Sequence, residues 1–199
     1  MNFRNFLRTV AVACTFAVAS TASATAILQV NSSGILTGAT GVNVGGTLYD
    51  VTLADGTCVA LFNNCVTSAF TFKSQAAATV AAQALLDQVF IDGPSGNFDS
   101  VTNKILGCTS TTNCLAFIPF VTTGTTFSVV YSANYSGSNT DSVSLTSVFS
   151  SQDTTQYNNA NFAIFKLVAP AASAVPEPSS ITLMALALAA LAFVRRRKV

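Results

Sequence analysis

The sequence contains no histidine and no tryptophan, and its only glutamate is Glu177. Without histidine, a catalytic triad with an imidazole base and a metal site with imidazole ligands are both excluded. Charged residues make up 9% of the 199 residues, whereas a typical soluble domain has about 25%. The chain is therefore either membrane-associated or has a surface made of Ser, Thr, Asn and Gln side chains.

The first 24 residues have the order of features that defines a secretory signal peptide. Two basic residues precede an apolar run, and the small residues of an A-x-A motif follow it: Arg4, Arg8, Val10–Val18, Ala22 and Ala24. Signal peptides are removed after such a motif. The sequence therefore predicts cleavage after Ala24, with Ala26 as the second choice.

The last 25 residues contain three ordered features. The motif Val175-Pro176-Glu177-Pro178 comes first, the apolar run Ile181–Val194 follows, and the chain then carries Arg195, Arg196, Arg197 and Lys198. The run has 14 residues, which span about 21 Å as a helix against a hydrocarbon core of about 30 Å. It is short for a permanent anchor, and the basic residues are expected to hold that end at the cytoplasmic face.

These features resemble the PEP-CTERM sorting signal of Gram-negative bacteria. The resemblance implies that an exosortase, a membrane-embedded cysteine protease, removes the tail as the protein passes from the inner membrane to the cell surface. It also implies an association with exopolysaccharide and with biofilm or floc formation. A Pro-rich linker before an ordinary single-span anchor is the alternative interpretation.

Removal of both ends changes the charge balance. The remaining 150 or so residues hold three lysines, seven aspartates and no arginine, so the mature net charge is −4. Binding to nucleic acid or to anionic lipid then lacks electrostatic support. We expect one exported domain over residues 25–168, a flexible stalk over 169–178 with the Pro-Glu-Pro motif, and a sorting tail over 179–199.

The pattern of the exported domain is mainly that of β-strands. Apolar and polar residues alternate in Thr47–Leu53, Thr125–Tyr135 and Val143–Ser147. Leu115–Val121 and Ala160–Val168 are predicted as further strands. Asp55-Gly56 is a turn signal, and it predicts a hairpin between Thr47–Leu53 and a second strand over Thr57–Phe62. Pro119 favours an edge or a bulge for its strand.

One segment, Ser74–Val89, breaks this pattern. Its polar residues recur every four positions among Ala, Val and Leu, which predicts a helix with a narrow polar stripe packed closely on a sheet. Ser74 is the expected N-cap, and Asp92-Gly93-Pro94 ends the helix. The sequence thus predicts a mainly β fold of β-sandwich-like antiparallel sheets with one packed α-helix.

Four cysteines remain after export, Cys58, Cys65, Cys108 and Cys114. An oxidising compartment favours two disulfides, for which three connectivities exist and the two local loops are the simplest. Zinc sites favour closer cysteine pairs, and a catalytic cysteine usually has a histidine partner.

Other candidate sites are less specific. Asp92, Asn97 and Asp99 lie in a Gly-rich stretch that suits calcium, but their spacing matches no calcium-binding loop. Glycoside hydrolysis needs two flanking carboxylates, and no pair of aspartates has a spacing that indicates one. Tyr157 and the other tyrosines could stack on sugars, although an aromatic residue on an alternating strand belongs more often to a core.

We therefore expect an exported, non-enzymatic surface or matrix protein with no catalytic residues and no cofactor. Its expected partners are a processing protease of the exosortase type and exopolysaccharide, while nucleic acid is not expected. The alternatives are an extracellular hydrolase that acts on polysaccharide and a permanently membrane-anchored module that binds a ligand.

Overall fold

A computed structural model describes residues 25–137 and 139–169 of the chain. This part covers the predicted exported domain except for residue 138. The predicted signal peptide with Ala22 and Ala24, the sorting motif Val175–Pro178 and the tail with Arg195, Arg196 and Arg197 lie outside the described residues.

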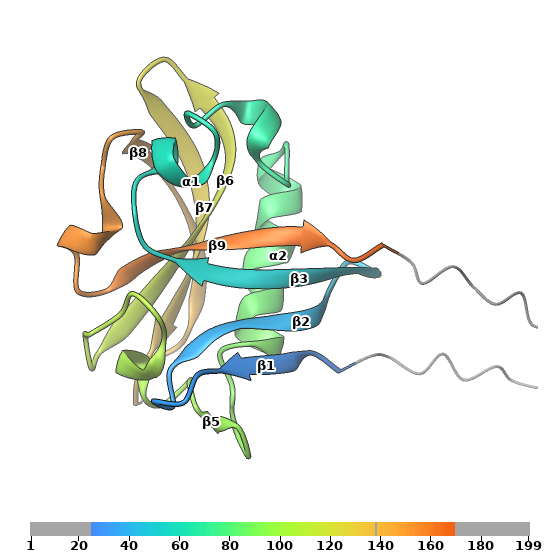
Figure 1. The fold of residues 1–199 in the computed structure, drawn as a ribbon, viewed down its shortest axis with the longest axis vertical. Coiled ribbons are helices and arrows are strands. Elements are labelled where there is room, and N and C mark those ends of the chain that lie inside the picture. The colour runs from blue at the N-terminus through green and yellow to red at the C-terminus, as the bar shows by residue number, and fades with distance from the viewer. Residues whose placement is uncertain (1–24, 138, 170–199) are drawn as a thin grey trace, which may run out of the picture.

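Seven strands form the main sheet in the order β1-β2-β3-β9-β6-β7-β8 (Figure 1). The strands are β1 (Ile27–Val30), β2 (Leu36–Val44), β3 (Thr47–Ala54), β6 (Asn113–Thr123), β7 (Thr126–Tyr135), β8 (Ser142–Phe149) and β9 (Ala160–Leu167), and a separate two-stranded ribbon consists of β4 (Asp92–Gly93) and β5 (Gly96–Asn97). The helices are α1 (Cys58–Leu61) and α2 (Gln75–Gln88), with 3₁₀ turns η1 (Thr67–Ala69), η2 (Thr102–Lys104) and η3 (Thr154–Gln156).

The mainly β fold with one packed helix is confirmed. The long strands belong to one hydrogen-bonded sheet, in which every neighbouring pair is antiparallel except β6 and β9. Strand β9, the last of the described strands, lies between β3 and β6. It joins the antiparallel strands β1–β3, which precede α2 in the chain, to the antiparallel strands β6–β8, which follow it. The layers that cover this sheet are α2 on one face and connecting segments on the other.

Helix α2 begins and ends close to the predicted residues. The Ser74 side chain caps it by accepting a hydrogen bond from the Ala77 N–H, which satisfies one of the free amide groups of the first turn. The predicted polar stripe faces solvent, and Gln83 donates to Asp87 one turn later at 2.9 Å. Small buried residues on the other face, such as Ala78, Ala81 and Ala82, let the helix lie close to the sheet.

The predicted second strand of the hairpin, Thr57–Phe62, is wrong. The segment forms the short helix α1, and Thr57 caps it by accepting from the Ala60 N–H. A disulfide holds Cys58 and Cys65 with their Cα atoms 5.1 Å apart, whereas an extended chain of seven residues would span about 23 Å. Strand β3 instead forms its hairpin with the preceding strand β2, which the sequence did not indicate.

Strand β2 was missed because glycines and a bulge interrupt its alternation. The register shifts between Ala39 and Val42, and Gly41 donates its N–H to Asp50. A Cβ atom at Gly38 would lie 2.1 Å from the carbonyl oxygen of Val51, so only glycine fits there. Pro119 lies at a similar register shift in the interior strand β6, which confirms the bulge and not the edge.

Two hydrophobic cores lie on opposite faces of the sheet. The first fills the space under α2 and includes Leu36, Val51, Leu85, Phe90 and Ile118. The second surrounds the Cys58–Cys65 disulfide and includes Phe62, Phe70, Phe127 and Phe162.

Between residues 25 and 169, with residue 138 left aside, no helix has the length and hydropathy to cross a membrane, and the run Ile181–Val194 lies outside that part.

Both predicted local disulfides are present, Cys58–Cys65 and Cys108–Cys114. We expect that replacing Cys108 and Cys114 together by alanine lowers the free energy of unfolding by about 2 kcal/mol, because the unfolded chain then loses a closed loop of about seven residues. Urea unfolding of the oxidised proteins measures this. In excess reductant the difference between wild type and variant should disappear, and equal stability of the two oxidised proteins would contradict the prediction.

Candidate functional site

The predicted calcium residues lie close together in one short loop, in which backbone amide groups occupy the Asp92 carboxylate. Asp92 and Asn97 are paired across the β4–β5 ribbon, and an Asp92 carboxylate oxygen accepts the N–H groups of Asp99 and Ser100 at 3.0 and 3.1 Å. Desolvation raises the pKa of Asp92, but interactions with the Ser100 side chain and with the backbone N–H groups of Ser100 and Asp99 outweigh it and lower the pKa below its usual value. The carboxylate therefore organises its own loop, and the described residues contain no group of three acidic, cysteine or histidine side chains that could hold a metal.

A pocket of about 210 Å³ lies on the face of the sheet opposite α2. Strands β6, β8 and β9 and the segment between β8 and β9 supply its lining, which consists of Leu115, Phe117, Val148, Gln152, Thr154, Tyr157, Asn159, Ala160 and Phe162. The parallel pairing of β6 with β9 places Leu115 opposite Ala160 and Phe117 opposite Phe162. Four side chains that are distant in sequence thus share one face and form the apolar floor.

The aromatic floor is held by edge-to-face contacts. The Phe117 ring lies 5.9 Å from the Phe162 ring and 6.0 Å from the Tyr131 ring, with steep interplanar angles of 68° and 82°. Such geometry places a ring edge against a ring face, which the aromatic quadrupoles favour. Of the predicted tyrosines, Tyr157 lines the pocket and Tyr131 supports its floor.

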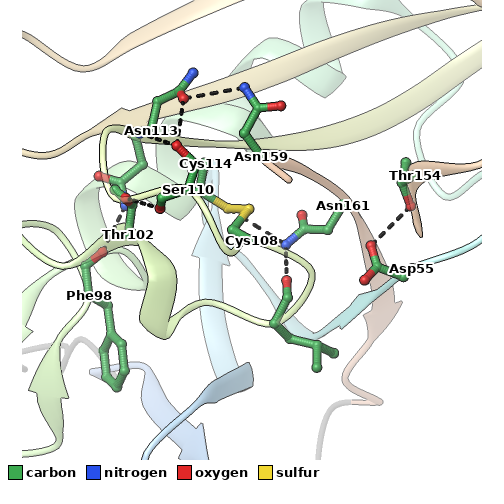
Figure 2. Close-up of a disulfide and its surroundings, with 12 residues drawn as sticks. Asp55, Phe98, Thr102, Cys108, Ser110, Asn113, Cys114, Thr154, Asn159 and Asn161 are labelled. Carbon is green, nitrogen blue, oxygen red and sulfur yellow. Dashed lines mark hydrogen bonds between the residues drawn. A yellow bond between two sulfur atoms is a disulfide. The ribbon is translucent and has the colours of Figure 1, made fainter. Parts of the chain in front are cut away.

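The segment between β8 and β9 forms the polar side of the pocket. Gln152 donates its side-chain amide to the Tyr157 hydroxyl at 2.8 Å. Thr154 is buried and donates its hydroxyl to Asp55 at 3.0 Å, and the same hydroxyl accepts the Gly56 N–H at 3.0 Å (Figure 2). Thr154 therefore fastens this segment to the end of β3.

Asp55 is a partly buried carboxyl close to this anchor. Desolvation raises its pKa above the usual value, the hydrogen bond from Thr154 lowers it in part, and the charge of Asp153 raises it further. A Cβ atom at Gly107 would lie 2.5 Å from the nearest Asp55 carboxylate oxygen, so glycine is required at that position. Asp55 itself does not line the pocket.

The second disulfide borders the other end of the same segment (Figure 2). Cys108 forms an isolated β-bridge with Asn159, and Asn159 donates to the Asn113 side chain at 3.3 Å. Asn161 is fully buried and donates to the Leu106 carbonyl and to Cys114 Sγ. Asn159 and Asn161 therefore connect the Cys108–Cys114 loop with the start of β9 through hydrogen bonds.

The lining of the pocket combines apolar side chains with neutral hydroxyl and amide groups. The pocket lining contains no carboxyl, amine or thiol group. Sequence reasoning missed the pocket because its floor depends on the parallel register of β6 with β9. The one available signal was the polar run of residues 150–159 between two strands, which is long for a simple hairpin connection.

The raised pKa of Asp55 predicts a pH dependence of stability. The folded protein binds the proton more tightly than the unfolded chain, whose carboxyl has a pKa near 3.8. The free energy of unfolding contributed by this group therefore rises as the pH falls toward 3.8. We expect the free energy of unfolding of Asp55→Asn to gain less than that of wild type as the pH falls from 7 to 3. Urea unfolding at several pH values in this range measures this.

Asp92→Asn is the matched control with the opposite sign. The lowered pKa of Asp92 gives stability above pH 3.8 that acid removes, so this variant should lose less stability on acidification than wild type. An identical pH profile for Asp55→Asn and wild type would contradict the prediction.

The comparisons with known proteins concern the C-terminal residues. A family model described as the PEP-CTERM protein-sorting motif matches residues 174–198, which include the Pro-Glu-Pro motif, the apolar run and the arginines. No curated protein and no solved structure matches the chain. The two disulfides fit a location outside the cytoplasm, where thiols are oxidised. The chain thus carries a PEP-CTERM sorting signal, which implies export and processing by an exosortase.

Proposed function

We propose that the processed protein is a non-enzymatic component of the cell surface or extracellular matrix that associates with exopolysaccharide. The observation that carries this proposal is the neutral hydrogen-bonding surface of the domain. Exposed positions on β8 and on the segment before β9 hold hydroxyl and amide groups, as at Ser142, Thr146, Ser147, Gln156 and Asn158. Such groups can exchange hydrogen bonds with sugar hydroxyls without strong attraction between charges.

The roles of the aspartates favour this proposal over a hydrolase. Six of the seven accept hydrogen bonds within the domain, as Asp141 does from the Tyr135 N–H and Asp153 from the Thr155 N–H. The pKa of Asp99 is raised by desolvation and by the charges of Asp141 and Asp92. A glycosidase needs a carboxyl group with a raised pKa and a second carboxylate, both beside a cleft for the substrate. The lining of the pocket consists of neutral groups instead.

The pocket also favours ligand binding, which is compatible with the alternative of a permanently membrane-anchored module that binds a ligand.

Whether the tail is removed separates a matrix component from a permanently anchored module. We expect the protein recovered from its producing cells to begin near Thr25, to end near Pro176 and to lack four thiol hydrogens. Intact mass under non-reducing conditions, with peptide mapping of both ends, measures this. A product that retains Arg195–Lys198 would support the permanent anchor.

We further expect the processed protein to sediment with exopolysaccharide purified from the same cells, and retention should persist in 1 M NaCl because neutral hydrogen bonds carry it. Cosedimentation at low and high salt measures this. The control variant replaces the exposed Lys104 and Lys166 by glutamine and should be retained equally. Absence of retention, or its loss in salt and in the lysine variant, would contradict the proposal.

A further inference from the structure

The pocket between β6, β8 and β9 has a composition that restricts its ligand. The accessible part of its floor is formed by the half-buried Leu115 and Phe117, with the buried Ala160 and Phe162 behind them. This floor offers only carbon atoms from side chains, while hydroxyl and amide groups stand on the side formed by Gln152 and Tyr157. A sugar hydroxyl placed on the floor would lose its hydrogen bonds to water without replacement, which is costly. An apolar substituent placed there would be stabilised by burial.

The polar side of the pocket provides complementary hydrogen-bonding groups. The Tyr157 hydroxyl accepts from the Gln152 amide and keeps its own hydrogen for donation, and the Gln152 carbonyl oxygen can accept. Tyr157 is 45% exposed, so a ligand can reach it from solvent. No lining group is charged at neutral pH, and the neighbouring carboxylates of Asp55 and Asp153 disfavour an anion.

The size of the pocket sets a second restriction. Its volume of about 210 Å³ lies below the roughly 300–1,000 Å³ of sites that enclose a drug-sized ligand. It is suited to one substituted sugar ring whose remaining chain stays outside. An extended acyl chain would need a longer slot.

We propose that this pocket binds a single neutral sugar unit bearing a methyl group, either as a 6-deoxy carbon or as part of an acetyl group, with the methyl on the aromatic floor. The sugar hydroxyls then face Gln152 and Tyr157. This inference rests on the proposed association with exopolysaccharide and names the unit that the protein recognises.

Saturation-transfer NMR on the processed protein tests the proposal with two matched pairs of probes. L-Fucose differs from L-galactose by the missing 6-hydroxyl, and N-acetyl-D-glucosamine differs from D-glucose by the acetamido group in place of a hydroxyl. We expect a saturable signal for at least one methyl-bearing sugar, at least tenfold tighter binding than for its partner, and the strongest transfer at the methyl protons.

Two variants connect this signal with the pocket. Ala160→Leu adds three carbon atoms at a buried lining position and should abolish the signal, while a cooperative thermal unfolding transition shows that the variant is folded. Tyr157→Ala should weaken binding at least tenfold. Phe149→Ala is the matched control, since Phe149 is an aromatic residue with 61% exposure outside the pocket, and it should bind as wild type does.

Several outcomes would overturn the proposal. These are equal binding of both members of each pair, no signal from any of the four sugars, a signal that survives in a folded Ala160→Leu variant, or saturable binding of decanoate in place of the sugars. If the wild-type protein still sediments with exopolysaccharide in any of these cases, the proposed function stands and only the pocket assignment fails. Loss of cosedimentation in the wild type would instead contradict the proposed function.

Discussion

The insertion of β9 between β3 and β6 is the constraint on which the rest of the structure depends. Without β9, the sheet would fall into two three-stranded halves that share no ladder. Each half has one bulged strand, β2 or β6, and β9 connects them through six register pairs on one side and three on the other. Because β9 is the last of the described strands, its contacts with β3 join residues far apart in the sequence, and contacts of this kind slow folding. The sorting motif begins at residue 174, soon after β9 ends at Leu167.

The sequence predicted the elements whose signals are local. The polar stripe of α2, its Ser74 cap, the disulfide spacing and the alternation in β7 all lie within short segments, and the structure follows them. Two kinds of information were absent. The glycines of β2 hide a strand whose bulge needs them. The turn signal Asp55-Gly56 predicted a strand after it, whereas the segment closed by the Cys58–Cys65 disulfide begins with a helix. Both errors have the same cause, because a tertiary constraint overrides the local pattern.

Strand β7 shows why alternation alone could not reveal the two-sided burial. Ser132 and Asn134 lie on its polar face, yet both are fully buried under α2 and the following segment. Ser132 donates to the Ala82 carbonyl at 2.9 Å and Asn134 to the Phe98 carbonyl at 2.7 Å. Ser132 thus holds α2 on the sheet, and the Asn134 amide group holds the segment around Phe98. The Asn134 side-chain oxygen is buried without a hydrogen-bond partner. The candidate site was less predictable still, since its floor is an outcome of β-sheet register.

The oxidation of the protein and the shape of its pocket are connected through the segment between β8 and β9. Thr57, next to Cys58, forms a β-bridge with Asp153, and Cys108 forms one with Asn159. The two bridges therefore hold the two ends of the segment that carries Gln152 and Tyr157, one beside the first disulfide and one at a cysteine of the second. Figure 1 shows this orange segment on the side of the domain opposite the start of β1 and the end of β9. The described part of the domain thus ends on one side, while the segment that forms the polar side of the pocket lies on the other.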